Sequence, residues 1–213
     1  MIRILIADDH AIFREGLRQI LEDDPEMVVA DEASGGHEVL EKVSKNDYDL
    51  LLLDIAMPGL NGLDTLKLLK SSKPKLRVLV LSMYPEEQYA VRAIKAGAAG
   101  YITKKSASEE LIEAIKKVSG GGRYISASIA ETLLFDLEPE PERPAHGRLS
   151  DREYQVLCMI ASGKTVSEIA VELFLSVKTV STHRVHILEK MKMKSNAELT
   201  NYAIKHNLVC LTD

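Results

Sequence analysis

The chain has 213 residues, of which 46% are hydrophobic and 28% are charged, with 27 basic and 32 acidic side chains. This apolar content excludes wholesale disorder, and the length suits one large domain or two modest ones. Two cysteines are too few for a disulfide framework, and an aromatic content of 5% disfavours a protein that stacks single-stranded bases. Because no apolar run approaches the roughly 18 residues that cross a membrane and the acidic N-terminus lacks a signal pattern, we expect a cytoplasmic protein without membrane contact.

Charge is unevenly distributed along the chain. Residues 1–135 carry a net charge of −4, residues 136–144 carry −3, and residues 145–213 carry +2. Prolines recur in the segment DLEPEPERPAHG, and because proline disfavours helix, this segment is predicted to be an extended linker. A long surface loop within one domain is the alternative. We therefore predict a first domain over residues 1–120, a connector helix and linker over 121–148, and a second domain over 149–213.

Apolar runs alternate with amphipathic stretches in the first domain. Short aliphatic runs at 2–7, 50–53 and 78–81, with weaker ones at 27–30 and 100–103, are typical of strands buried on both faces of a parallel sheet. The stretches between them space their apolar residues three and four apart, which places those residues on one helix face. The pattern predicts an α/β doubly wound domain with a five-stranded parallel sheet, in which ligands bind at the carboxyl ends of the strands.

Polar side chains follow four of the five predicted strands. Asp8 and Asp9 follow the first, Asp54 follows the third, and Ser82 and Lys104 follow the fourth and fifth. Carboxylates gathered at one sheet edge repel one another, and a Mg²⁺ ion bound through their oxygens would relieve that repulsion. Helix capping is the ordinary alternative role for an aspartate at a strand end. The combination of acids, a hydroxyl and an ammonium at one edge favours a binding site.

In this order, Asp8-Asp9, Asp54 with MPGLNG close behind it, Ser82 and Lys104 resemble the receiver domain of two-component response regulators. The resemblance covers about residues 1–120. It implies that Asp54 is the phosphoacceptor and that Lys104 pairs with the phosphoryl group. It also implies a magnesium site, with ligands from Asp8, Asp9, Asp54 and the backbone carbonyl of Ala56.

The same resemblance implies that Ser82 and Tyr101 are switch residues that move when the phosphoryl group arrives. For Tyr101, an ordinary half-buried sheet aromatic is the alternative. Haloacid-dehalogenase phosphatases also place a nucleophilic aspartate after an apolar strand, but they carry a general acid two residues later, where this chain has Ala56. We therefore expect a regulator and not an enzyme.

Helical periodicity replaces the strand pattern from Leu149 onward. Ser150 and Glu153 have the spacing of a capping box that opens a helix, and further helices are predicted near 165–173, at 178–191 and from 196. Two short helices joined by a tight turn describe a helix-turn-helix. The second domain is therefore predicted to be a small all-α four-helix domain.

The predicted helix at 178–191 has an outward face that suits the major groove of DNA, because polar and small side chains recur on it at helical spacing. A solvated face of an ordinary helical domain is the alternative, since a net charge of +2 is small for a nucleic-acid binder. The candidate DNA contacts are Lys178, Thr179, Ser181, Thr182, Arg184 and Val185.

The segment from LSDREYQVL through EIA and SVKTVSTH to the last helix closely resembles the LuxR-type DNA-binding domain, over about residues 149–208. With the receiver, the chain is identified as a member of the NarL/FixJ-type response regulators. The resemblance implies a sensor histidine kinase as partner, double-stranded promoter DNA as target, and a homodimer when phosphorylated. A receiver that dimerises without phosphorylation is the remaining rival.

Overall fold

The structure, a computed structural model, describes residues 1–135 and 144–209. The chain forms two compact units, residues 1–133 and 134–213. Most of the predicted linker, residues 136–143, lies outside the described residues. None of the helices among the described residues is long and apolar enough to cross a membrane.

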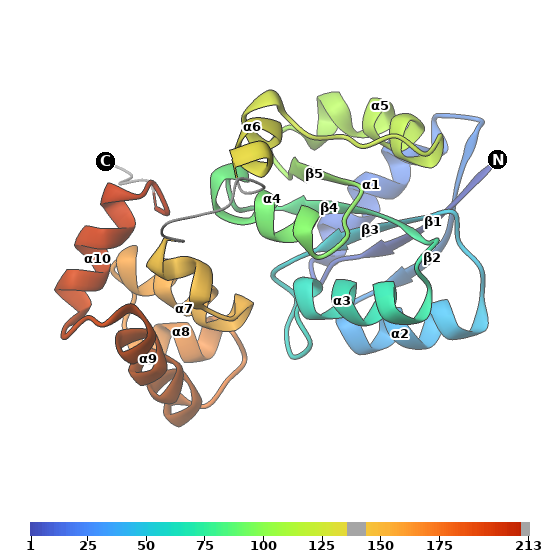
Figure 1. The fold of residues 1–213 in the computed structure, drawn as a ribbon. Helices are drawn as coiled ribbons and strands as arrows, with labels where there is room; N and C mark the ends of the chain where they lie inside the picture. The colour runs from blue at the N-terminus through green and yellow to red at the C-terminus, as the bar shows by residue number, and fades with distance from the viewer. Residues whose placement is uncertain (136–143, 210–213) are drawn as a thin grey trace. The chain divides into compact units, whose positions relative to one another are not determined.

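The first unit is built on a five-stranded parallel sheet in the order β2-β1-β3-β4-β5, which confirms the predicted fold (Figure 1). Helices α1 to α4 each connect two successive strands, and the helices cover both faces of the sheet, with α1 and α5 on one face and α2 and α3 on the other. The strands are β1 (Ile2–Ala7), β2 (Met27–Ala33), β3 (Leu50–Asp54), β4 (Arg77–Ser82) and β5 (Gly100–Thr103). The helices are α1 (Ala11–Glu22), α2 (Gly36–Lys45), α3 (Gly62–Ser72), α4 (Glu86–Lys95), α5 (Ala107–Ser119) and α6 (Ala127–Phe135).

The core of this unit follows from the alternation of side chains along its central strands. Leu50 and Leu52 of β3 join the cluster that α1 and α5 cover. Leu51 and Leu53 point to the other face and are also fully buried. Continuous aliphatic runs are therefore required here, because both faces of β3 are covered.

Strand β2 is longer than its apolar run and extends through Asp31 and Glu32 to Ala33. It is an edge strand, and its acids have cationic or hydroxyl partners: Glu32 pairs with Arg14 and Arg18, and the Tyr48 hydroxyl donates to Asp31 over 2.6 Å. Polar residues are accommodated at this edge because their charges are paired. Hydrophobic pattern alone therefore ended the predicted strand too early.

The loop after β3 turns back tightly onto the end of that strand. The Gly62 N–H donates to the Ile55 carbonyl at 3.1 Å, and Asn61 caps α3 by accepting from the Asp64 N–H. A Cβ atom on Gly62 would lie 2.0 Å from the carbonyl oxygen of Asp54. Only glycine fits this position, which holds the loop against Asp54.

Within residues 144–209, the second unit has the four predicted α-helices and, before them, a short 3-10 helix that was not predicted (Figure 1). Ser150 and Thr165 each open a helix with a complete capping box, and Phe174 adopts a positive φ of 54° in the turn after α8. Val180, Ile187 and Met191 are the buried face of α9. The elements are η1 (Ala145–Arg148), α7 (Asp151–Ala161), α8 (Val166–Glu172), α9 (Val177–Met191) and α10 (Asn196–Lys205).

Glu153 joins two helices of this unit through a buried carboxylate. Its oxygens accept from Lys190 Nζ on α9 at 2.8 and 2.6 Å, and one of them also accepts the Ser150 N–H at 2.8 Å. Burial opposes ionisation, but these donors outweigh it and hold the pKa of Glu153 below its usual value. Next to it, Arg152 donates to the Leu173 carbonyl at 2.9 Å, which ties α7 to the turn after α8.

We predict that Gly62→Ala destabilises the first unit by about 1–3 kcal/mol, because the added methyl group forces the β3–α3 loop away from Asp54. Calorimetric unfolding of the full chain measures the change. The matched control is Gly16→Ala in α1, where a Cβ atom has no neighbour within 4 Å. That variant is expected to gain about 0.5–1 kcal/mol of helix stability. Equal effects of the two substitutions would contradict the prediction.

We predict that Glu153→Gln destabilises the second unit by about 1–2 kcal/mol at neutral pH, because a charge-assisted link from α7 to Lys190 is lost. A carboxyl whose folded pKa is depressed stabilises the fold above its unfolded pKa, and this contribution disappears as pH falls through the folded pKa. The difference between wild type and variant should therefore shrink in acid.

Hydrogen exchange of α7 and α9 amides, corrected for intrinsic rates at each pH, measures this effect. Glu189→Gln, at an exposed position of α9, is the control and should leave protection unchanged. A constant difference between Glu153→Gln and wild type at every pH would show that the carboxylate charge is not what stabilises the link.

Candidate functional site

The carboxyl edge of the sheet brings together residues that are far apart in the sequence. Asp8 follows β1, Asp54 is the last residue of β3, and Lys104 follows β5. Because all the strands are parallel, their carboxyl ends meet at one edge. The acids and the ammonium predicted to share this edge do share it.

Lys104 forms an ion pair with each of two buried aspartates. Its Nζ lies 2.5 Å from Asp8 Oδ2 and 2.8 Å from Asp54 Oδ2, and the three side chains are 4%, 2% and 0% exposed, respectively. The ammonium also lies 4.7 Å from the centre of the Phe13 ring, within cation–π range. One cation therefore compensates two carboxylates that would otherwise repel each other.

This arrangement shifts the pKa values of both partners. Burial raises the pKa of Asp54 and outweighs the opposing effect of Lys104, with Asp8 adding a further increase by like-charge repulsion. Burial alone would lower the pKa of Lys104, but Asp54 and Asp8 together raise it. Lys104 is therefore held as an ammonium, and Asp54 is a carboxylate whose negative charge is poorly solvated.

The acidic cluster has the composition of a divalent-cation site. Asp8, Asp9, His10 and Asp54 each present a ligand atom within 4.8 Å of the others. Asp8 Oδ2 and Asp9 Oδ1 are buried oxygens whose contacts among the described residues are ion pairs with Lys104 and His10. Carboxylate oxygens suit hard divalent cations. The cluster could hold a metal ion.

Ser82 and Tyr101 meet at the loop that follows β4. Both side chains are buried. The Ser82 hydroxyl accepts from the Tyr84 N–H at 3.1 Å, and the Tyr101 hydroxyl donates to the Tyr84 carbonyl at 2.8 Å. The two residues are therefore linked through the backbone of Tyr84. Ala56 lies in the loop after β3, where its N–H donates to Asp54 Oδ1 at 3.2 Å.

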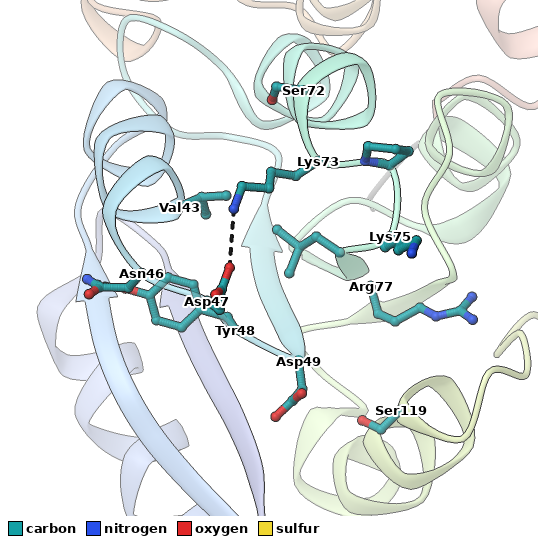
Figure 2. A pocket seen from close by; sticks show the side chains of 12 residues that line it. Val43, Asn46, Asp47, Tyr48, Asp49, Ser72, Lys73, Lys75, Arg77 and Ser119 are labelled. Carbon is teal, nitrogen blue, oxygen red and sulfur yellow. Dashed lines mark hydrogen bonds and ion pairs between the residues drawn. The ribbon is translucent and has the colours of Figure 1, made fainter.

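A separate hollow lies at the opposite edge of the sheet, near the amino ends of β3 and β4 (Figure 2). It has a volume of about 610 Å³ and contains none of the predicted site residues. Its charges are mixed, and Lys73 is paired with Asp47 at 3.2 Å, as the dashed line in Figure 2 shows. This hollow is therefore distinct from the carboxyl-edge site.

The six candidate DNA contacts on α9 differ in how freely they can reach a ligand. Lys178, Thr182 and Val185 are exposed, whereas the other three are partly buried. The Thr179 hydroxyl lies 2.7 Å from that of Ser176, the helix N-cap. Arg184 donates to Asn196 at 2.6 Å and so contacts the start of α10. Of the six, Thr179 and Arg184 are therefore already engaged in contacts within this unit.

His10 and Phe13 are site residues that the pattern of strand ends does not identify. His10 stands directly beside the acid pair, so its position in the sequence carried a signal. Phe13 lies inside α1, and only the packing of that helix against the sheet edge reveals its contact with Lys104.

Two family models match the chain in succession. Residues 4–116 match the response regulator receiver domain, and residues 147–203 match the bacterial regulatory proteins of the luxR family. The first match contains the whole carboxyl-edge site, and the second contains the predicted helix-turn-helix. The combination is that of a regulatory protein and not of a phosphatase.

Relatives of similar length match both units together. The chain is 37% identical to response regulator UvrY of Escherichia coli over 98% of this chain and 96% of the relative. It is 38% identical to the oxygen regulatory protein NreC of Staphylococcus carnosus, over 97% and 99%. A structure of RcsB from Salmonella enterica serovar Typhimurium, bound to promoter rprA with phosphomimetic BeF3−, aligns with a TM-score of 0.63 at 26% identity, over 94% of this chain and 97% of that one.

The parallel sheet with its acidic carboxyl edge, the helix-turn-helix unit and these full-length similarities agree with one another. The chain belongs to the NarL/FixJ-type two-component response regulators.

Proposed function

We propose that this chain is a transcription regulator that a sensor histidine kinase phosphorylates on Asp54, and that it then binds promoter DNA as a homodimer. The observation that carries the proposal is the buried contact of Lys104 with both Asp8 and Asp54, in a chain that also has a LuxR-type domain. A promoter-binding regulator acts where the DNA is, which supports a cytoplasmic location.

Asp54 is proposed as the nucleophile. Its carboxylate oxygen would form a bond to phosphorus while the bond from phosphorus to the donor breaks, and the donor leaves with that electron pair. Burial leaves the Asp54 charge poorly solvated, so cationic groups must offset the approach of a phosphoryl anion. Lys104 is already in contact with Asp54, at 2.8 Å, and supplies one such group.

Magnesium is the proposed cofactor of this edge. Asp8, Asp9 and Asp54, with the backbone carbonyl of Ala56, would hold it, and the oxygen-rich donor set of the cluster supports this choice. When bound, Mg²⁺ neutralises charge on the phosphoryl oxygens. Lys104 would then shift from bridging two carboxylates to pairing with the phosphoryl group.

Ser82 and Tyr101 are proposed to carry the change away from Asp54. Both are hydrogen-bonded to the backbone of Tyr84, so a movement of Ser82 toward the phosphoryl group changes what the Tyr101 hydroxyl can reach. The loop before α4 would change shape in response. Phosphorylation would in this way bias the chain toward the dimer.

The exposed face of α9 is proposed to read the major groove. Lys178 can meet phosphate or guanine, Thr182 can form hydrogen bonds, and Val185 can contact a thymine methyl group. RcsB has been seen bound to DNA, in one structure as two dimers on two parallel DNAs. Its similarity to this chain supports the same mode of binding here. The small net charge of the second unit favours two linked reading helices over one.

We predict that Asp54→Asn abolishes phosphorylation by acetyl phosphate, because an amide is a poor nucleophile. Phosphate-affinity electrophoresis measures the modification. DNA-binding anisotropy, on an operator selected from random duplexes with treated wild-type protein, measures the consequence. The control is Asp47→Asn, whose side chain is 98% exposed, and it should behave as wild type.

Retained phosphorylation of Asp54→Asn would rule out Asp54 as the acceptor. Loss of phosphorylation with DNA affinity and output unchanged would instead favour the rival, in which the receiver dimerises without phosphorylation.

We predict that Lys178→Ala weakens binding to all DNA sequences and reduces the salt slope of log K by about 1, because one phosphate contact is lost. Lys75→Ala removes the same charge from the exposed end of the receiver sheet and should leave the slope unchanged. Anisotropy titrations across a range of salt concentrations distinguish them. Equal slopes for wild type and Lys178→Ala would exclude a phosphate contact by Lys178.

A further inference from the structure

His10 lies against the acidic cluster at the start of α1. Its N–H donates to Asp8 Oδ1 at 2.9 Å, which fixes the backbone beside that carboxylate. Its ring Nδ1 lies 2.9 Å from Asp9 Oδ1 and 3.2 Å from Asp8 Oδ1. The imidazole is therefore directed at the two carboxylates that stand beside it in the sequence.

Capping of the helix does not explain this orientation. His10 is the N-cap of α1, but its side chain makes no capping hydrogen bond. The residues preferred at an N-cap are serine, threonine, aspartate and asparagine, which satisfy a free backbone N–H of the helix. In the part of the chain that the structure describes, the hydrogen-bond and ion-pair contacts of the His10 ring are with Asp8 and Asp9.

The cluster is nearly the size of a metal coordination sphere when His10 is included. The four ligand atoms of Asp8, Asp9, His10 and Asp54 lie within 4.8 Å of one another. Opposite ligands of an octahedral ion with bonds of about 2.1 Å lie about 4.2 Å apart. A contraction of about half an ångström would bring the set to that size, and the His10 side chain, which is 64% exposed, has room to move.

We propose that the His10 imidazole is a nitrogen ligand of this site and tunes its preference from Mg²⁺ toward first-row transition-metal ions. Carboxylate and water ligands suit Mg²⁺, whereas imidazole suits ions such as Fe²⁺, Ni²⁺ and Zn²⁺. The inference rests on the proposed function, since Asp8, Asp9 and Asp54 must hold the cation in the first place. It adds a consequence, namely that transition-metal ions compete with Mg²⁺ for the metal site beside the phosphoacceptor Asp54.

Mn²⁺ bound to the full chain is the probe, because it is paramagnetic and occupies magnesium sites. Pulsed electron paramagnetic resonance should detect the ¹⁴N modulation of a coordinated imidazole in wild type, and His10→Gln should abolish it, because a glutamine amide nitrogen is not a ligand. The bound Mn²⁺ is then displaced with Mg²⁺ or with Ni²⁺. The preference for Ni²⁺ over Mg²⁺ should fall on the order of tenfold in His10→Gln.

His37→Gln is the matched control, because His37 is an exposed histidine of the same unit on α2. It should retain both the ¹⁴N modulation and the wild-type preference. Absence of the modulation in wild type, or its persistence in His10→Gln, would overturn the role of His10 while leaving the proposed function intact. Mn²⁺ binding that Asp9→Asn does not weaken would instead contradict the cation site of the proposed function, and with it this inference.

Discussion

The ion pairs of Lys104 with Asp8 and Asp54 are the constraint around which the receiver is organised. Both carboxylates are buried at the ends of neighbouring strands, and leaving them there without a cation would be costly. One ammonium serves both, at 2.5 and 2.8 Å. A phosphoryl group or a metal ion would compete directly for these partners, which makes the edge responsive to binding.

Two different kinds of contact surround Asp54. The β3–α3 loop is packed tightly against its backbone, whereas the β4 side carries the hydrogen-bonded residues Ser82 and Tyr101. Gly62 allows the β3–α3 loop to pack against the Asp54 carbonyl, where any side chain would clash. On the β4 side, Tyr84 joins Ser82 and Tyr101 through hydrogen bonds of its own backbone. A change at Asp54 is therefore more easily accommodated on the β4 side, because hydrogen bonds to a loop are exchanged at less cost than packed backbone is moved.

The second unit combines an apolar core with polar links between its helices. The carboxylate of Glu153 holds α7 to α9, and Arg152 holds α7 to the turn before α9. These bonds set the position of the helix that is proposed to read DNA. Because residues 145–213 carry a net charge of only +2, affinity should come from two copies acting together.

The sequence by itself located most of the elements, since aliphatic runs and helical spacing report directly on which side chains are buried. It placed the five strands, the capping box at Ser150 and the acids at the strand ends. Only the tertiary structure decided how these parts interact. The extension of β2, the sharing of Lys104, the Asn196 contact of Arg184 and the direction of the His10 ring depend on partners distant in the chain or on side-chain orientation. Hydrophobic pattern encodes burial, whereas polar contacts of this kind are set by three-dimensional geometry.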